Sequence, residues 1–390
     1  MSGLPGVKFN ISNDGLGQTA QVEDTIVGMI LTGVAIAGAG NVSVGEAYQV
    51  FSLAGAVAIG ITEADNAHAY RHIKEYYDQA GTGSELWFML TTNPTKMSDM
   101  LDINEDFATK LINASEGRIR YLVVSQKSQS GVTVTDGLDE DVEVAVNNGQ
   151  QLAQAFTDAF KPVRVIVDGK DFNGNPQDLK DYTQEQYNRV LLLIAGTGGK
   201  NASVGLLAGR LAANPVQRSI GRVRDGNLGI LGAKFTNDEP VQDLEGAWNS
   251  IHDKGYTFLR TLPGKGGFYF TDDQTLTEPT DDFNSLKRVA VIDKAMLVAL
   301  GVYVDNILDE IPVDESGQIS PALIGNWQAD VLSALNSQMT DNGEISGATA
   351  FIDPAQDILG SSRLEISIGI QPVGYAKYIE INLGFTTELD

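Results

Sequence analysis

RIRYLVVS at residues 118–125 and VRVIV at residues 163–167 are short, mostly apolar runs, and VEVAVNNGQQLAQAFTDAF at residues 142–160 separates them. The two runs have the length of buried strands, and the separating stretch has the apolar spacing of a helix. Two strands joined by a long helix form a crossover, which places the strands parallel in one sheet. These residues therefore predict an α/β fold.

The same alternation of strands and helices extends on both sides of this stretch. The apolar residues from Ile26 to Gly40 are interrupted by glycines, so they predict a buried strand and turn rather than a membrane segment. Strands separated by helices predict a largely parallel sheet covered on both faces, over about the first 250 residues. The further expected elements are strands at 56–61 and 85–91 and helices at 63–79, 97–113 and 183–195.

The pattern changes after Gly226. Asp281 and Asp282 are placed to stabilise the N-terminus of a following helix, and Ser320 before Pro321 is a good cap and first turn for another. This part of the chain is predicted to be α+β. Its expected elements are strands at 256–262 and 268–271, joined by a Gly-rich turn, and helices at 283–310 and 320–339.

Both ends of the chain have the period of two residues that is typical of a half-buried strand. Chain ends are usually frayed unless another element holds them. We therefore expect these ends to pair with a partner, which indicates assembly more than catalysis. The alternating apolar residues are Val7, Phe9 and Ile11, then Leu364, Ile366, Ile368 and Ile370, and finally Ile379, Ile381, Leu383 and Phe385.

Composition excludes several classes of protein. The chain has 390 residues, 42% of them apolar, which is ordinary for a globular protein with a core. It contains no cysteine, so disulfides and thiolate chemistry are excluded and a cytosolic origin is the simplest interpretation. The net charge of −24, from 27 Lys and Arg against 51 Asp and Glu, argues against a nucleic-acid binder.

Two glycine-rich stretches resemble nucleotide-binding loops only loosely. Gly15–Ala20 matches the dinucleotide fingerprint, but no acid follows at the distance needed to bind a ribose. Gly196–Asn201 resembles a phosphate loop, but Leu193 stands where its first glycine is needed and Asn201 follows the lysine. A connection between two helices is the better interpretation of the second stretch.

His68 and His72 have the spacing of two metal ligands on one helix, with Asp65 and Glu75 nearby. A solvated helix face explains the same residues equally well. His252 is the only other histidine, so a Ser-His-Asp triad would have few candidates. We therefore predict no catalytic, cofactor-binding or metal-binding residues.

Several segments follow the order found in contractile tail sheath proteins, and the opening Gly3–Val7 is similar to the start of many of them. The likeness covers roughly residues 200–390 and the first ten, whereas the middle α/β region matches only in general character. The chain thus resembles a contractile tail sheath protein. The segments are NPVQRSIGRV at 214–223, GGFYFT at 266–271, NSLKRVAVID at 284–293 and GYAKYIEI at 374–381.

The resemblance implies a structural subunit, not an enzyme, of a bacteriophage tail or a phage-tail-like contractile injection system. Such subunits stack as hexameric rings around an inner tube, with extended arms adding strands to sheets of neighbouring copies. Stored conformational energy would drive the tube through a target envelope without a cofactor. The implied partners are further copies, the inner tail tube protein, the baseplate and the tail terminator or cap proteins, with no nucleic acid and no membrane insertion. The protein would be made in the bacterial cytoplasm and become part of a virion tail or tail-like particle.

The resemblance also divides the chain into four expected regions. Residues 1–20 would be an N-terminal linking arm, and 21–225 an α/β region that lies partly on the outer surface. Residues 226–360 would form a sheath core with two long helices, and 361–390 the C-terminal strands and linking arm.

Three groups of site residues follow from this assignment. A basic cluster at the start of the first long helix is expected to face the tube; alternatively, it pairs with Asp281, Asp282 and Asp293 as a solvated helix end. The subunit-linking residues are Val7, Phe9, Ile11, Tyr378, Ile379, Ile381, Leu383 and Phe385; the arm hinges are Gly6, Gly15, Gly369 and Gly374; the tube-facing residues are Lys287, Arg288 and Lys294.

Two alternatives stay open at this point. A different self-assembling virion or tube protein would keep the strand exchange but would not contract. A soluble α/β enzyme or binding protein would instead need a small-molecule pocket with convergent polar groups.

Overall fold

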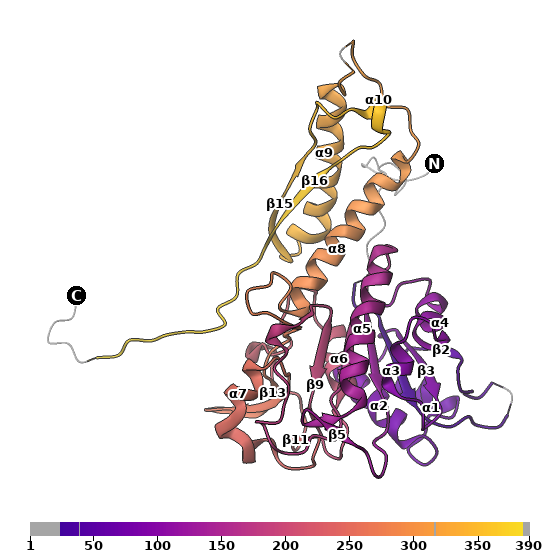
Figure 1. Cartoon of the computed structure of the whole chain (residues 1–390), viewed down its shortest axis with the longest axis vertical. Helices are drawn as coiled ribbons and strands as arrows, with labels where there is room; N and C mark the ends of the chain where they lie inside the picture. The colour runs from indigo at the N-terminus through magenta and orange to yellow at the C-terminus, as the bar shows by residue number, and fades with distance from the viewer. Residues whose placement is uncertain (1–23, 39, 316, 385–390) are drawn as a thin grey trace, which may run out of the picture. The chain divides into compact units, whose positions relative to one another are not determined.

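A computed structural model describes residues 24–38, 40–315 and 317–384. The chain forms two compact units. The larger unit contains the described residues of Glu23–Lys294, Gly343–Ser346 and Gln371–Asp390, and the smaller unit those of Ala295–Asn342 and Gly347–Ile370. Figure 1 shows the elements of both units with their labels.

A six-stranded mixed sheet forms the centre of the larger unit, in the order β2-β3-β1-β4-β7-β9. Only β2 runs antiparallel to its neighbour, and the other adjacent strands are parallel. Every residue of β1, β4, β7 and β9 is buried, as expected for strands covered on both faces. The strands are β1 (Val27–Thr32), β2 (Ala47–Val50), β3 (Leu86–Thr91), β4 (Tyr121–Ser125), β7 (Arg164–Asp168) and β9 (Val190–Leu193).

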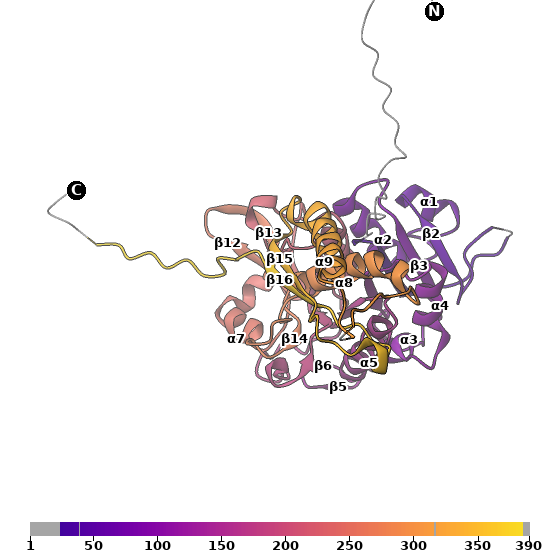
Figure 2. The same ribbon diagram turned by 90° about the horizontal axis from the view of Figure 1, so that it is seen from above.

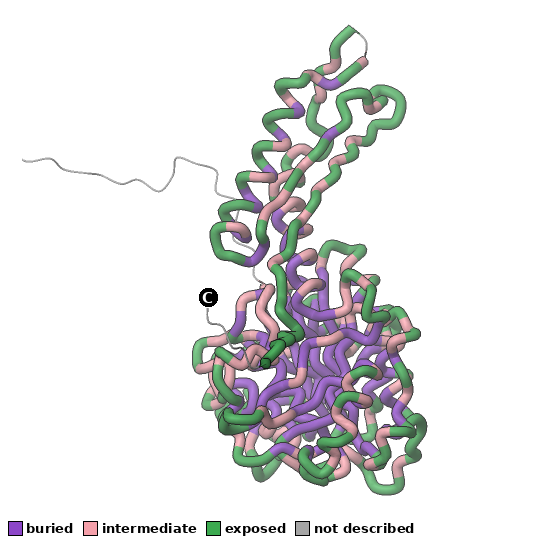
Figure 3. Tube along the Cα trace, turned by 90° about the vertical axis from the view of Figure 1, so that its left-hand side faces the viewer, coloured by how far each residue is buried: buried purple, intermediate pink, exposed green. Residues whose placement is uncertain are grey.

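Helices cover this sheet in two layers. One layer contains α2 and α6, which contact each other and β1, β4 or β7, while α3, α4 and α5 contact the strands from the other layer. Apolar side chains from both layers and the sheet form one continuous core, which fills the interior of the larger unit in Figure 3. The helices are α1 (Leu53–Ala58), α2 (Ala67–Ala80), α3 (Met97–Leu101), α4 (Asp106–Ala114), α5 (Asp141–Asp158) and α6 (Val204–Ala212).

Small sheets and short helices complete the larger unit. The two-stranded sheets are β5 (Val134–Thr135) with β6 (Leu138–Asp139), β8 (Gln186–Tyr187) with β14 (Leu276–Thr277), β10 (Ala195–Gly196) with β11 (Lys234–Phe235), and β12 (Leu259–Leu262) with β13 (Lys265–Phe270). The short helices are η1 (Tyr182–Gln184), η2 (Val223–Asp225), η3 (Val241–Ala247) and α7 (Trp248–Asp253).

The smaller unit packs a helix against a two-stranded sheet. Trp327 and Ile324 of α9 form a small core with Ile319 and Ile352, and the Tyr303 hydroxyl donates to the Trp327 carbonyl at 3.1 Å. Figure 2 shows α9 beside β15 and β16. The elements that lie wholly or partly in this unit are α8 (Leu286–Tyr303), η4 (Val304–Asn306), α9 (Pro321–Leu335), η5 (Asn336–Thr340), β15 (Ile345–Phe351), α10 (Ile358–Ser361) and β16 (Ser367–Pro372).

Most predicted elements of the α/β part are confirmed, including the strands at 85–91, 118–125 and 163–167 and the helix at 142–160. The buried strand expected after Ile26 is β1. The helix expected at 97–113 is two helices, because the Asp102 side chain accepts from the Asn104 amide at 2.8 Å and ends α3 in a turn.

Two element predictions are wrong. The expected strand at 56–61 is instead occupied by the end of α1, whose first turn is capped by the Ser52 hydroxyl accepting from the Gly55 amide at 3.0 Å. The expected helix at 183–195 is instead η1, β8 and β9. Its run Val190–Leu193 pairs with β7 at the edge of the main sheet.

One further prediction is corrected by the elements that flank its segment. The loop Gly196–Asn201 follows β10 and precedes α6, so it does not connect two helices. Residues 373–384 contain no strand within the single chain, so the expected pairing of the second C-terminal strand with a partner stays a prediction. Val7, Phe9, Ile11 and Phe385 lie outside the described residues.

Candidate functional site

The segment after β16 exposes a row of large apolar side chains. Tyr378, Ile379, Ile381 and Leu383 are 78%, 77%, 79% and 95% exposed. In Figures 1 and 2 this yellow segment extends away from the larger unit. Ile379, Ile381 and Leu383 stand at alternate positions, which is the pattern of a strand with one apolar face.

The root of this segment is held by three contacts on the larger unit. The Lys377 Nζ lies 2.7 Å from the Asp272 Oδ2, and the Tyr375 hydroxyl donates to the Gln217 carbonyl. The Lys287 ammonium lies over the Tyr375 ring, 5.0 Å from its centroid. The segment therefore has a fixed root and an exposed end.

Two of the predicted hinge glycines lie beside this root. Gly369 lies within β16, and a Cβ added to it would lie 2.7 Å from the Thr349 Oγ1, so the Thr349 side chain would have to shift to admit a larger residue there. Gly374 lies between β16 and Tyr375 with no atom near its Cβ position. Gly6 and Gly15 lie outside the described residues.

The lysines of the predicted tube-facing cluster are buried in ion pairs. Lys287 Nζ lies 2.7 Å from Asp273 Oδ1, and Lys294 Nζ lies 2.6 Å from Asp24 Oδ2 and 2.7 Å from Glu344 Oε2. The alternative interpretation, in which the cluster pairs with Asp281, Asp282 and Asp293, does not apply to these two lysines. Arg288 is half-buried, and its guanidinium contacts the Asp282 carbonyl and the Asn284 side chain at 3.4 and 3.5 Å.

Asp272, Asp273 and Lys287 form a coupled group beneath the segment root. Burial disfavours ionisation of Asp272, yet the contact with His252 and the charges of Lys287 and Lys377 hold its pKa well below the usual value. Burial raises the pKa of Asp273. Burial alone would lower the pKa of Lys287, but the two carboxylates raise it above the usual value. Lys287 is therefore a cation that holds two acids together.

A second polar cluster lies where β4 and β7 end. The Ser125 hydroxyl donates to Asp168 Oδ2 at 2.5 Å, and its oxygen lies 3.1 Å from His68 Nε2 and 3.3 Å from His72 Nε2. Because the single hydroxyl hydrogen goes to Asp168, both imidazoles donate to the serine oxygen. The Gly205 amide donates to His72 Nδ1 at 3.4 Å, which fits this tautomer.

This arrangement differs from a catalytic triad, in which the histidine accepts the serine proton and the carboxylate orients the histidine. Here the carboxylate of Asp168 directly accepts the hydrogen bond of the serine hydroxyl. Burial, reinforced by the charge of Arg71, lowers the pKa of His68 to about 3 and that of His72 well below 6.5. Burial raises the pKa of Asp168 to about 6. The histidines are neutral, and the cluster joins α2 to the sheet.

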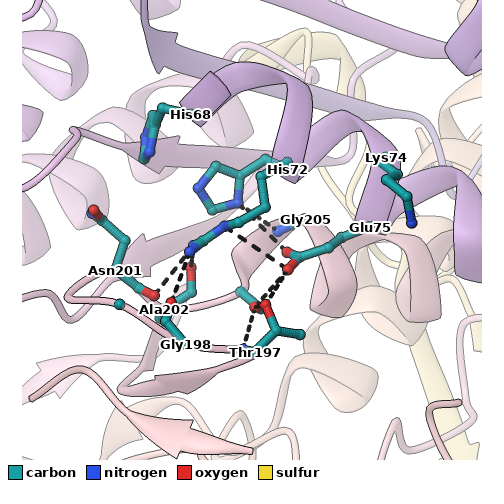
Figure 4. Close-up of polar contacts among 12 residues, drawn as sticks. His68, His72, Lys74, Glu75, Thr197, Gly198, Asn201, Ala202 and Gly205 are labelled. Atoms are coloured by element: carbon teal, nitrogen blue, oxygen red, sulfur yellow. Dashed lines mark hydrogen bonds and ion pairs between the residues drawn. The ribbon is translucent and has the colours of Figure 1, made fainter. Parts of the chain in front are cut away.

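Glu75 and Arg71 extend the polar contacts from α2 to the loop before α6, and Figure 4 shows Glu75 beside Thr197 of that loop. Glu75 Oε1 accepts from the Thr197 hydroxyl at 2.8 Å and from the Ser203 hydroxyl at 2.9 Å. The Arg71 guanidinium donates to the carbonyls of Gly198, Asn201 and Ala202 at 3.0 to 3.2 Å. Burial raises the pKa of Glu75.

The loop Gly196–Asn201 is occupied by the chain's own side chains. The Ala202 amide donates to Asp168 Oδ1 at 2.7 Å, and the Gly199 amide donates to Asp238 Oδ1 at 2.8 Å. These are the kind of backbone donors that bind phosphate at a helix N-terminus. Carboxylates therefore take the places that an anion would use.

The described part of the chain contains no group of three or more His, Cys, Asp or Glu side chains arranged to hold a metal ion. Nor does any helix in the ranges 24–38, 40–315 and 317–384 have the length and apolar character to cross a membrane.

Two cavities open on the larger unit, of about 880 Å³ between α2, α6 and residues 227–232 and about 290 Å³ beside the ends of β4 and β7. Their cationic side chains already have partners within the chain, as in the contact of 2.8 Å between Lys170 and Asp139. In the larger cavity Arg71 Nε, Glu75 Oε2 and Arg210 Nε have no hydrogen-bond partner, although each of these side chains bonds the chain through its other atoms.

Family models match almost the whole chain. The DUF2586 N-terminal domain matches residues 4–274 and the DUF2586 C-terminal domain matches residues 282–390. This chain belongs to the DUF2586 family. A search of curated proteins finds no match to the DUF2586 chain.

The DUF2586 chain has the fold of contractile sheath proteins. It is similar to the helical sheath of the anti-feeding prophage in its contracted state, with 13% identity, a TM-score of 0.64 and full coverage of both chains. The contracted sheath of the PVC extracellular contractile injection system aligns with a TM-score of 0.60, 13% identity, and coverage of 100% and 98%. A sheath tail protein from Listeria innocua aligns with a TM-score of 0.50, 12% identity, and coverage of 90% and 95%. The predicted resemblance is confirmed for the fold.

Sequence reasoning missed several polar residues of the DUF2586 chain that the fold brings together. Ser125 and Asp168 are the last residues of two buried strands, which is a signal that polar side chains meet at the carboxyl edge of a sheet. Asp272 and Asp273 carried no such signal, because their partners Lys287 and Lys377 are distant in sequence.

Proposed function

We propose that the protein is a structural subunit of a contractile tail sheath, with no enzymatic activity. It would stack as hexameric rings around an inner tube and contract to drive that tube through a target envelope. The observation that carries the proposal is the match over the whole chain to sheath proteins of contractile injection systems. Its partners would be further copies, the tube protein, the baseplate and terminator proteins, in a particle assembled from subunits made in the bacterial cytoplasm.

The exposed C-terminal segment supplies the link between copies in this proposal. Residues 378–384 would add as a strand to an edge of the sheet β15–β16 in a neighbouring copy, since that sheet has two strands within the described part of the chain. Each ladder hydrogen bond contributes about 1 kcal/mol net. Each of Ile379, Ile381 and Leu383 contributes about 1.5–3 kcal/mol when fully buried. Several such links per subunit make the lattice strong through multivalency.

Residues 1–20 would form a second arm, and the long α8 or α9 would contact the tube. Contraction would use energy trapped in the extended lattice and released by a trigger at the baseplate. No nucleotide is required, which agrees with a phosphate-like loop that is filled by Asp168 and Asp238.

Electron microscopy of the purified protein, alone and with its tube subunit, tests the proposal. We expect hollow striated cylinders for the intact chain. Ile379→Ser, Ile381→Ser and Leu383→Ser combined should abolish them, whereas Glu380→Ser and Asn382→Ser, which change the alternate positions, should not. Uniform small particles from the intact chain under all conditions, or cylinders from both variants, would contradict the proposal.

A further inference from the structure

The contacts at the root of the C-terminal segment join it to three separate parts of the larger unit. Tyr375 contacts the loop that holds Gln217, Lys377 pairs with Asp272 in the turn after β13, and Lys287 at the start of α8 covers the Tyr375 ring. Before these contacts, the Pro372 carbonyl accepts from the Ser346 hydroxyl at 3.1 Å. Beyond them, residues 378–384 are exposed. The contacts with the larger unit therefore end at Lys377, and the exposed segment begins at Tyr378.

Asp272, the partner of Lys377, and its neighbour Asp273 have further contacts of their own. Asp273 Oδ1 accepts from the Ser219 hydroxyl at 2.8 Å, and Asp273 Oδ2 accepts from the Lys287 amide at 3.0 Å. Asp272 is largely buried, and the Lys287 ammonium lies 3.7 Å from its Oδ1. A partly desolvated ion pair to a fixed carboxylate holds a side chain better than a pair in solvent, where the ions are screened.

We propose that Tyr375 and Lys377 are positioning residues that anchor the root of the C-terminal arm, so that the part free to reach another copy begins at Tyr378. They are two positions apart, which is the side-chain period of an extended chain, so both side chains reach the same surface. Rotation at Gly374 then requires the anchor to open. The role of the anchor in linking copies rests on the proposed function. The contacts that form the anchor lie within a single chain and do not depend on that function.

Limited digestion with trypsin, which cuts after Lys377, tests this anchor on the full-length, unassembled protein. Release of residues 378–390 is followed by mass spectrometry and normalised to cleavage after Lys265, the exposed first residue of β13. Tyr375→Phe removes the donor to Gln217 but keeps the ring, and Asp272→Asn removes the carboxylate of the ion pair. We expect cleavage after Lys377 to become about five-fold faster in each variant, equivalent to about 1 kcal/mol.

Glu365→Gln is the matched control, because it removes the partner of Arg363 in an exposed ion pair elsewhere in the C-terminal region. It should leave the cleavage rate after Lys377 unchanged. Thermal unfolding verifies that each variant is folded, and Tyr375→Phe decides the question if Asp272→Asn is destabilised. Unchanged cleavage in a folded Tyr375→Phe variant would overturn the anchor. Failure of the intact chain to form cylinders would instead overturn the proposed function and leave this rate comparison valid.

Discussion

Gly205 of α6 faces the main chain of His72 in α2 so closely that an added Cβ would lie 2.1 Å from the His72 carbonyl oxygen. Four residues later, a Cβ on Gly209 would lie 2.4 Å from the Tyr76 carbonyl oxygen. Residues four apart lie on one face of a helix, so the two glycines form a strip without side chains. This strip lets α6 approach α2 and brings the loop before α6 within reach of Glu75.

Gly205→Ala should lower the free energy of unfolding by about 1–3 kcal/mol or more, because a methyl group cannot fit against a backbone carbonyl. Gly325→Ala on α9 is the control. Nothing lies within 4 Å of its Cβ position, so alanine should be neutral or stabilise by up to about 1 kcal/mol. Urea unfolding of both variants measures the difference, and equal stabilities would contradict the close approach.

The pKa of His68, lowered by burial to about 3, makes stability depend on pH. The unfolded chain binds a proton below about pH 6.5 that the folded chain does not, so this contribution is present above pH 6.5 and is lost as pH falls toward 3. Asp168, with a pKa raised to about 6, acts in the opposite direction between about pH 6 and 4.

His68→Gln keeps an N–H donor for Ser125 but cannot titrate. Between pH 6 and 4.5 its stability should fall less steeply than that of the wild type, by up to about 1.4 kcal/mol per pH unit. Urea unfolding at a series of pH values measures both slopes. Parallel slopes for the two proteins would show that His68 binds protons equally in both states.

The buried ion pairs of Lys287 and Lys294 change how tube contact must be tested. Substituting Lys287 leaves Asp273 without its cation, and removing one partner of a buried pair costs about 3–5 kcal/mol. A loss of tube binding would then reflect unfolding. Arg288→Gln should weaken co-assembly with the tube subunit and leave the unfolding temperature within about 2 °C of the wild type. Unchanged co-assembly would remove Arg288 from the proposed tube-facing residues.

Lys294 connects Asp24 to Glu344, which are distant from each other in the sequence. Lys294→Met should destabilise the larger unit by about 3–5 kcal/mol, because it leaves the buried Glu344 and the partly buried Asp24 without their shared cation. Lys74→Met, which removes an exposed pair with Asp78, should change the stability by less than about 1 kcal/mol. Chemical unfolding compares the two, and similar small effects would contradict the structural role of Lys294.

The strand and helix alternation of the larger unit could be predicted, because strand-length apolar runs such as Tyr121–Ser125 alternate with a helix of regular spacing. Whether a short apolar run forms a helix or a strand is harder to predict. Residues near Ala56 and those at Val190–Leu193 have no periodicity that separates helix from strand, and the outcome depends on the Ser52 cap in one case and pairing with β7 in the other. Residues 379–384 alternate like a strand but form none, since a strand needs a partner that a single chain does not supply.

The polar clusters could be predicted only in part. His68 and His72 were recognised as a pair, but their contact with Ser125 depends on how α2 crosses β4. The partners of Lys287 and Lys294 depend on contacts between distant segments, and nothing in local spacing indicates them.

Diluting the protein does not empty the anion position at the start of α6, because Asp168 of the same chain occupies it. Its carboxylate bonds the Ala202 amide and the Asn201 side chain at 2.7 Å, where a helix N-terminus commonly takes up phosphate. A soluble anion leaves such a site when its concentration falls, but a tethered carboxylate is present once per chain at every concentration. The N-terminus of α6 is therefore stabilised equally in a cell that is rich in metabolites and in a medium that contains no nucleotide.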